Sequence, residues 1–277
     1  MVKRKWIKYI IRGLIIVIGG LWWFNRPVDI RNKYLRHSLT ADDYEKGKAL
    51  IREMETAYGG KEAWLRQMMV SFVQRAEWYG RQKISHWDTL PQRFELRAKP
   101  GSDNCEMTLL NGPNTGTIWG VENGQTYTFD QDRNRKNTEP NAYTDKLIYK
   151  NYWFQFPFRI GEAPIIAYAG SEELEGKNYD LIYATWGSEK ANPEYDQFVL
   201  YLNKESRLVE YLHFTVREKF GAIGLTAKFE DFRRIGPFRL PQSQFVRLGN
   251  PLKKGLKMHE NHYELIQLDT IPVLNEK

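Results

Sequence analysis

Apolar and polar residues alternate along most of the chain, most regularly from Asp196 to Val246. In that stretch Phe198, Leu200 and Leu202 share one parity, and a turn-like segment follows them. Period-two alternation interrupted by turn residues is typical of antiparallel strands joined by hairpins. One parity is apolar and the other carries Lys, Arg, Glu and Thr, so we expect a sheet that is covered on one face only.

Shorter alternating runs precede and follow this stretch, separated by turn signals such as Asn111-Gly112 and Asn123-Gly124. Asp130 to Asn141 is polar and basic, which indicates an exposed loop. Altogether the pattern predicts a mainly β (α+β) chain with about eleven antiparallel strands in sequential order. The strands expected outside the central stretch are Phe72 to Trp78, Lys83 to Trp87, Arg93 to Arg97, Glu106 to Leu110, Gly116 to Glu122, Gln125 to Phe129, Ile165 to Glu172, Tyr179 to Trp186 and His262 to Ile271.

Helical spacing of apolar residues occurs in two places. In residues 40–67 Leu50 and Met54 belong to an apolar stripe, and Thr40 is placed to cap the first turn. A second helix is expected from Ala142 to Phe154, before the chain reaches two prolines. An amphipathic helix beside a sheet with an uncovered apolar face is expected to cover that face.

A short apolar run near the N-terminus predicts a membrane segment. Five basic residues precede Gly13 to Phe24, which carries no charge. As a helix this run spans roughly 18 Å, against a hydrocarbon core of about 30 Å. Extension back to Ile7 gives eighteen residues if Lys8 and Arg12 reach the headgroups with their side chains. We therefore expect the chain to contact the membrane through residues 7–24.

The end of this run favours an uncleaved signal anchor over a cleaved signal peptide. Trp22-Trp23 suits the aromatic belt of a membrane interface, and no small-x-small cleavage site follows. A buried hydrophobic hairpin is the alternative. We expect residues 1–36 to form an anchor and linker, with residues 37–277 as one domain outside the cytoplasm, in the bacterial periplasm or envelope.

Composition narrows the function classes. Lys plus Arg number 41 against 34 acidic residues, a net charge of +7 that is concentrated near the N-terminus, so no nucleic-acid surface is indicated. The nine Trp, sixteen Tyr and fourteen Phe suit either an ordinary β-sheet or a wide apolar cavity. Cys105 is the single cysteine, which excludes an intramolecular disulfide and is typical of a small buried apolar side chain.

Enzyme motifs are absent from the sequence, which contains no G-x-S-x-G, Gly-rich phosphate loop, H-E-x-x-H or C-x-x-C. His259 and His262 would share a helix face, but a strand would direct them to opposite sides. Solvated side chains are the preferred interpretation of the acidic pairs, which are Asp42-Asp43, Glu172-Glu173 and Glu230-Asp231. We expect no catalytic residue, metal or cofactor, although distant groups can assemble without a motif.

One apolar face of the predicted sheet is too large for the predicted helices to cover. The sheet should therefore either close on itself around a packed core or enclose a cavity. The candidate cavity-lining residues share the inward parity of their strands. They are Phe72, Trp78, Phe94, Leu96, Met107, Leu109, Phe198, Leu200, Leu212, Phe214, Leu225 and Phe229.

Four stretches resemble the outer-membrane-lipoprotein-sorting (LolA/LolB/LppX-like) superfamily. They are Ala57 to Trp64, Tyr179 to Trp186, Asp196 to Glu218, and Phe229 to Pro241. The resemblance covers roughly residues 45–248 and implies an unclosed β-barrel with helices plugging the concave face around a cavity for lipid or lipoprotein acyl chains. This chain differs from the soluble carrier by its N-terminal anchor and from the acceptor by lacking a lipoprotein cysteine. No single ligand-contacting residue is carried over.

We therefore expect a non-enzymatic, membrane-tethered envelope protein that binds a lipid or other hydrophobic ligand in a barrel cavity, in lipid or lipoprotein trafficking. A structural module with a filled barrel, binding a protein partner that the sequence does not identify, is the main alternative. A hydrolase with a dispersed site is a further alternative. A continuous cavity, a packed interior, or carboxylates and histidines converging in the concavity would distinguish the three.

Overall fold

Thirteen antiparallel strands form one continuous sheet in the part of the chain that the structure describes. The structure is a computed structural model, and it describes residues 12–15, 17–20, 22, 26–35, 37–80, 89, 91–129, 134–218, 220–253 and 255–270. The strands are β1 (Gln67–Trp78), β2 (Gln92–Ala98), β3 (Cys105–Leu109), β4 (Ile118–Glu122), β5 (Gln125–Phe129), β6 (Arg135–Thr138), β7 (Ile165–Leu174), β8 (Lys177–Thr185), β9 (Gln197–Asn203), β10 (Val209–Val216), β11 (Phe220–Ile235), β12 (Phe238–Leu248) and β13 (Lys257–Thr270). The helices are η1 (Ile30–Lys33), α2 (Ala41–Ala57), α3 (Lys61–Leu65), α5 (Ala142–Arg159) and η3 (Ile160–Glu162).

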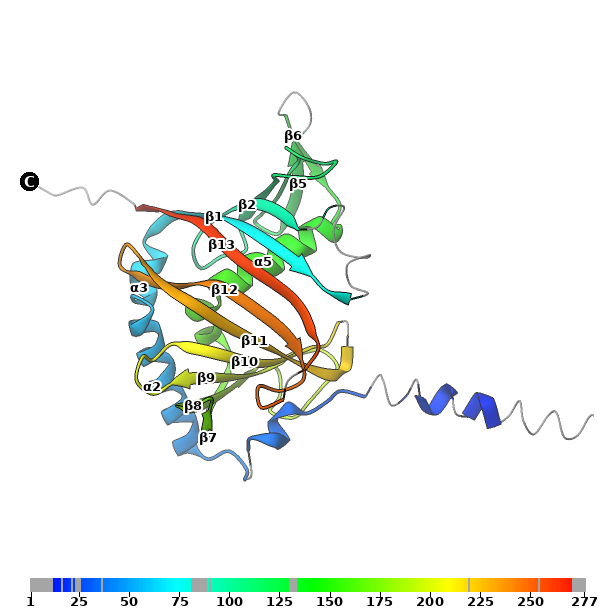
Figure 1. Ribbon diagram of the computed structural model, residues 1–277, viewed down its shortest axis with the longest axis vertical. Helices are drawn as coiled ribbons and strands as arrows, with labels where there is room; N and C mark the ends of the chain where they lie inside the picture. The colour runs from blue at the N-terminus through cyan, green and yellow to red at the C-terminus, as the bar shows by residue number, and fades with distance from the viewer. Residues whose placement is uncertain are drawn as a thin grey trace, which may run out of the picture.

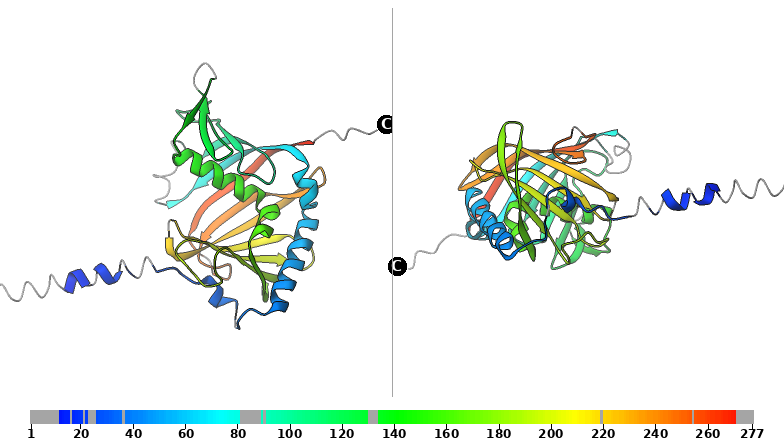
Figure 2. Two further views of the ribbon diagram at one scale, coloured as in Figure 1. Left: turned by 180° about the vertical axis from the view of Figure 1, so that it is seen from behind. Right: turned by 90° about the horizontal axis from the view of Figure 1, so that it is seen from below.

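The sheet consists of two meanders joined by the last strand. Its order is β6-β5-β4-β3-β2-β1-β13-β12-β11-β10-β9-β8-β7, so β13 lies between β1 and β12. The two edge strands, β6 and β7, are consecutive in the chain, and α5 connects them. The curved sheet wraps around α5, which crosses its concave side, while α2 runs along one end (Figure 1, Figure 2). The predicted unclosed antiparallel sheet is confirmed.

Helix α2 begins where the sequence predicts. The Thr40 hydroxyl accepts a hydrogen bond from the Asp43 backbone, and the Asp43 carboxylate accepts one from the Thr40 backbone, forming a capping box. Gly47 lets the helix approach β7 closely, because a Cβ there would lie 2.7 Å from the Ala167 backbone. The helix therefore packs on the edge of the sheet through a position that tolerates no side chain.

The interior is filled mainly by aromatic side chains from α5 and α3. Trp64 stacks on Phe158 with ring centroids 4.5 Å apart, and the Phe154 ring stacks on Phe72 of β1 at 3.9 Å. The Trp64 indole nitrogen donates a hydrogen bond of 3.1 Å to Gln155 Oε1. Such a core has the close packing expected of a protein interior, and α5 rather than α2 contributes most of it.

Two sequence predictions differ from the structure, and a third is not tested by it. Strand β6 occupies part of the predicted loop from Asp130 to Asn141; its side chains are exposed or half-buried, so it has no apolar alternation to reveal it. The second helix continues beyond Phe154 to Arg159 with Pro157 inside it, because the residues around the proline are buried in the core. The strand predicted from Lys83 to Trp87 lies outside the described residues.

The outer face of the sheet is also partly covered, contrary to the prediction of a single covered face. Ile30 and Tyr34 join buried side chains of β7 to β10, including Tyr183 and Tyr201, in a second apolar cluster. The short helix η1 therefore packs on the convex side (Figure 2).

The predicted membrane segment, residues 7–24, lies largely outside the described residues. Within the described ranges, no helix has the length and apolar character needed to cross a bilayer.

Candidate hydrophobic-ligand site

The twelve predicted lining residues share one face of the sheet. All belong to, or pack against, a single apolar cluster that includes α2, α3 and α5. Eleven are buried and Trp78 is half-buried. The burial of these side chains agrees with the predicted inward orientation. Most of them, however, contact other core residues rather than open space. Of the twelve, Phe198 and Phe214 line a cavity beside α5, and Phe229 lines a void of about 10 Å³.

The cavity that Phe198 and Phe214 line, here called the α5 groove, lies between one side of α5 and the inner face of β9 and β10. Its volume is about 500 Å³, within the range of roughly 300–1,000 Å³ that is usual for small-ligand sites. The lining residues are Asp103, Asp145, Ile148, Tyr149, Tyr152, Trp153, Arg159, Asp196, Phe198, Phe214, Thr215, Val216 and Glu218.

Aromatic side chains form one part of the α5 groove's walls, and four carboxylates with Arg159 form another. Trp153 of α5 meets Phe214 of β10 edge to face, with centroids 4.7 Å apart, and Phe198 lies 6.4 Å from Phe214 in a parallel arrangement. From Asp145 to Arg159 the helix rises by roughly 21 Å at about 1.5 Å per residue. A groove with this length and lining suits an extended apolar chain.

One part of the groove carries a half-buried carboxylate, Asp196. Asp196 Oδ1 accepts hydrogen bonds from the Thr215 hydroxyl, at 2.9 Å, and from the Arg217 backbone, at 2.8 Å. Burial nevertheless raises the pKa of Asp196 above its ordinary value, and these hydrogen bonds oppose the shift. These contacts fix the position of the carboxylate at the edge of the groove.

Another part of the groove offers donors without partners. Arg159 Nη1 donates to Asp103 Oδ1 at 2.7 Å, and the guanidinium lies 5.0 Å from the Tyr152 ring centroid. Within the described residues, the Tyr152 hydroxyl and Arg159 Nε are buried and have no hydrogen-bond partner. Buried donors that lack partners are costly, so this pair is suited to acceptor atoms of a bound ligand.

A second polar group lies on the other side of α5. Lys150 donates to Asn261 Oδ1 at 2.9 Å, and Asn261 also contacts Gln74 at 2.5 Å and Gln244 at 2.7 Å. Burial, with a smaller effect from Lys146, lowers the pKa of Lys150 to about 7. Only neutral groups contact this amine among the described residues.

The other candidate groups do not form a reactive cluster. His259 lies opposite Trp78 and His262 opposite Arg75 in the β1–β13 register, so the two rings lie on opposite faces as predicted. No group of three potential metal ligands occurs within the described part of the chain.

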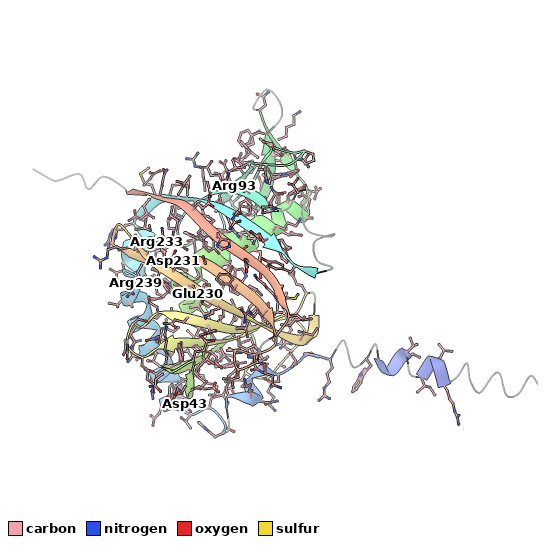
Figure 3. The ribbon with its side chains drawn as sticks, in the orientation of Figure 1. Asp43, Arg93, Glu230, Asp231, Arg233 and Arg239 are labelled. Atoms are coloured by element: carbon pink, nitrogen blue, oxygen red, sulfur yellow. The ribbon has the colours of Figure 1, made fainter. Side chains whose placement is uncertain are left out.

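The acidic pairs are mainly in salt bridges or at helix caps. Asp231 pairs with Arg233 at 2.8 Å on the outer hairpin, and Glu230 pairs with Lys228 at 2.8 Å. Asp43 caps α2, and Glu172 accepts a hydrogen bond from Tyr201. Figure 3 shows Glu230 and Asp231 on the convex side, with Asp43 at the end of α2.

The α5 wall of the groove is not among the residues predicted from the sequence. Ile148, Tyr149, Tyr152 and Trp153 follow the i, i+1, i+4, i+5 spacing of one helix side. Both sides of α5 are apolar, since the opposite side packs in the core, and this all-round apolar character was the available signal for a helix inside the barrel.

Comparisons with known proteins identify the fold. No protein-family description and no curated sequence matches the chain. A LolA superfamily protein from Nitrosomonas europaea superposes with a TM-score of 0.51 at 12% identity, covering 82% of this chain and 94% of the other. A putative outer membrane lipoprotein-sorting protein domain from Vibrio parahaemolyticus gives 0.53 at 11% identity, covering 81% and 93%.

A DUF1329 family protein from Desulfovibrio piger gives a TM-score of 0.52 at 10% identity, covering 82% of this chain and 93% of that chain. Identities this low establish the fold alone. The resemblance inferred from the sequence is thereby confirmed at the level of structure: this chain has the fold of LolA superfamily and lipoprotein-sorting domains.

Proposed function

We propose that this protein binds the acyl chain of a lipid or lipoprotein in the α5 groove, without catalysing a reaction. The observation that carries the proposal is a partly aromatic groove of about 500 Å³ in a fold shared with a LolA superfamily protein and with a putative outer membrane lipoprotein-sorting domain. Apolar walls bind a hydrocarbon by removing it from water, at roughly 25 cal/mol per Å². A sixteen-carbon chain offers on the order of 10 kcal/mol before ordering costs, at about 0.8 kcal/mol per methylene.

The proposal includes a membrane tether through residues 7–24 and a domain in the bacterial envelope. Leu14, Ile15, Val17, Ile18 and Trp22 are exposed large apolar side chains in the segment that precedes this domain in sequence. Exposed apolar surface of this kind favours a lipid environment. Basic residues precede the apolar run, in keeping with an N-terminus in the cytoplasm.

Photocrosslinking tests the proposed binding site. The full chain is reconstituted in phospholipid vesicles that contain a fatty acid with a diazirine near its methyl end, and crosslinked peptides are mapped by mass spectrometry. We expect crosslinks at Tyr149, Trp153 and Phe214. Val216→Trp narrows the groove and should reduce these crosslinks at least about fivefold, whereas the exposed control Met68→Trp should not. Crosslinks spread over the surface and absent from the groove would overturn the proposal.

A filled barrel that acts as a protein-interaction module is the second candidate. It is favoured by the stacking of Phe154 of α5 on Phe72 and by the burial of most of the predicted lining residues in one apolar cluster, which leaves little space around them. Under this alternative the Val216→Trp and Met68→Trp variants would crosslink equally, because no lipid would occupy the groove.

A further inference from the structure

The chain is fixed to the domain almost immediately after the apolar N-terminal run. The Val28 backbone nitrogen donates to the Gly221 carbonyl at 2.8 Å, and Arg217 Nη2 donates to the Val28 carbonyl at 2.7 Å. The Ile30 nitrogen then donates to Gln197 Oε1 at 3.1 Å. Residues 28–30 are therefore held by the β9 end and by the β10–β11 turn.

Tyr34 continues this attachment on the convex face. Its hydroxyl lies 2.6 Å from His213 Nδ1, and both side chains are buried. The Tyr34 ring meets the Tyr201 ring edge to face at 6.1 Å. The segment that follows the apolar run is thus part of the folded domain, so it cannot serve as a long free linker.

The short connection limits how far this end of the domain can lie from a membrane. Only Asn25, Arg26 and Pro27 separate Phe24 from Val28. The four residue steps from Phe24 to Val28 span at most roughly 14 Å when fully extended, at about 3.5 Å each. If the apolar run ends at the membrane interface, the β10–β11 turn must lie within that distance of the headgroups.

The loop between β12 and β13 lies at the same end of the sheet. The Gly249 nitrogen donates to the Gly224 carbonyl at 2.8 Å, close along β11 to the residue that binds Val28. The loop exposes two large apolar side chains, Leu252 at 46% and Leu256 at 74%. Figure 1 shows the loop beside the point where the N-terminal segment leaves the domain.

Cations accompany the two leucines. Arg26, Lys33 and Lys253 are exposed. Lys33 and Lys253 are close enough that the Lys253 charge contributes, after burial, to a lowered pKa of Lys33, while Glu172 opposes the shift. Exposed apolar side chains among cations are typical of surfaces that bind anionic bilayers.

We propose that Arg26, Lys33, Leu252, Lys253 and Leu256, here called the membrane rim, rest on an anionic bilayer surface. The leucines insert below the headgroups and the cations bind lipid phosphates. The proposal rests on the tether proposed above, and the short connection to Val28 brings the rim to the bilayer. The rim is distinct from the α5 groove and adds a second membrane contact to the tether.

The rim also gives the groove an orientation. Asp196, which lines the groove, is bound to the backbone of Arg217, and Arg217 holds Val28. Thr215, Val216 and Glu218 line the same part of the groove. That part of the groove therefore lies near the residues that hold the N-terminal segment.

Depth-dependent fluorescence tests the rim on the full chain in phosphatidylcholine–phosphatidylglycerol vesicles. A polarity-sensitive fluorophore is attached to the cysteine of the Leu256→Cys variant. The native Cys105 is buried, and the parent protein treated with the same fluorophore measures any labelling of Cys105. We expect blue-shifted emission and at least about twofold quenching by lipids spin-labelled on the acyl chain. Met68→Cys is the matched control, since Met68 is 53% exposed but lies beside the far end of β13, roughly 40 Å from Lys257 at about 3.3 Å per residue.

Alkaline extraction of the same vesicles separates the two proposals. If the chain resists extraction and the Leu256 probe is quenched while the Met68 probe is not, the rim is supported. If the chain resists extraction but both probes remain unquenched, the rim is overturned and the tether stands. If the chain is extracted, the tether is refuted and the rim, which depends on it, is refuted as well.

Discussion

Replacement of Lys150 by methionine should stabilise the protein near neutral pH. Lys150 is only 4% exposed, and its amine contacts Asn261 and no carboxylate among the described residues. Burial lowers its pKa from 10.5 to about 7. This lower proton affinity in the folded state corresponds to a destabilisation of the folded protein by roughly 5 kcal/mol, at about 1.4 kcal/mol for each pKa unit. Methionine keeps a similar volume and loses one hydrogen bond, worth about 1 kcal/mol, so we expect a net gain of roughly 3 kcal/mol at pH 7.

The sign of the pH dependence follows from the direction of the shift. Between about pH 7 and 10.5 the unfolded chain binds the Lys150 proton and the folded chain does not. The free-energy penalty that Lys150 imposes on the folded parent protein therefore falls as pH rises across that window, and the protein becomes more stable. The advantage of Lys150→Met should be largest at or below pH 7 and should shrink toward pH 10.

Urea unfolding monitored by tryptophan fluorescence at pH 6, 7, 9 and 10 measures both effects. The exposed lysine variant Lys99→Met is the matched control and should change the free energy of unfolding by less than about 0.5 kcal/mol. A Lys150→Met variant that is less stable than the parent at every pH, or whose advantage does not vary with pH, would refute the assignment of Lys150 as an uncompensated buried amine.

Three further predictions concern the packing that positions the groove. Burial lowers the pKa of His213 to about 3, with a smaller effect from Lys33, so the folded state should lose stability as pH falls from about 6.5 to 3, and His213→Gln should flatten that dependence in urea titrations. Trp64→Ala should cost about 3–5 kcal/mol in the same assay, because the indole is fully buried in the core. Gly47→Ala should lower the melting temperature by several degrees in calorimetry, because the new Cβ would lie 2.7 Å from the Ala167 backbone.

Most strands could be predicted from the sequence because one face of each is buried. Alternation from Phe94 to Ala98 and from Cys105 to Leu109 reports that burial directly, whereas β9 is buried on both faces. Strand β6 could not be found in this way. Its residues, Arg135 to Thr138, lie at the sheet edge, and neither set of alternating side chains is buried. Its position depends on backbone pairing with β5, which leaves no hydrophobic pattern in the sequence.

The inward face of the sheet was also predictable, but the division between packed core and groove was not. Phe94 and Phe214 have the same parity and the same residue type. Phe94 lies in the core, whereas Phe214 borders the groove, because α5 fills the space unevenly. That difference depends on where a helix crosses the sheet, which residue periodicity does not encode. The docking of Tyr34 on His213 likewise depends on contacts distant in sequence.

The central position of β13 has a consequence for how the protein is made. Of the thirteen described strands this one leaves the ribosome last, yet it pairs with β1 on one side and β12 on the other. Until it is synthesised, the two meanders share no strand pairing, and β1 keeps an open edge while most of the chain is being translated. Such an edge invites incorrect pairing with another chain, so a nascent chain truncated before Lys257 should need protection by chaperones that the complete protein does not.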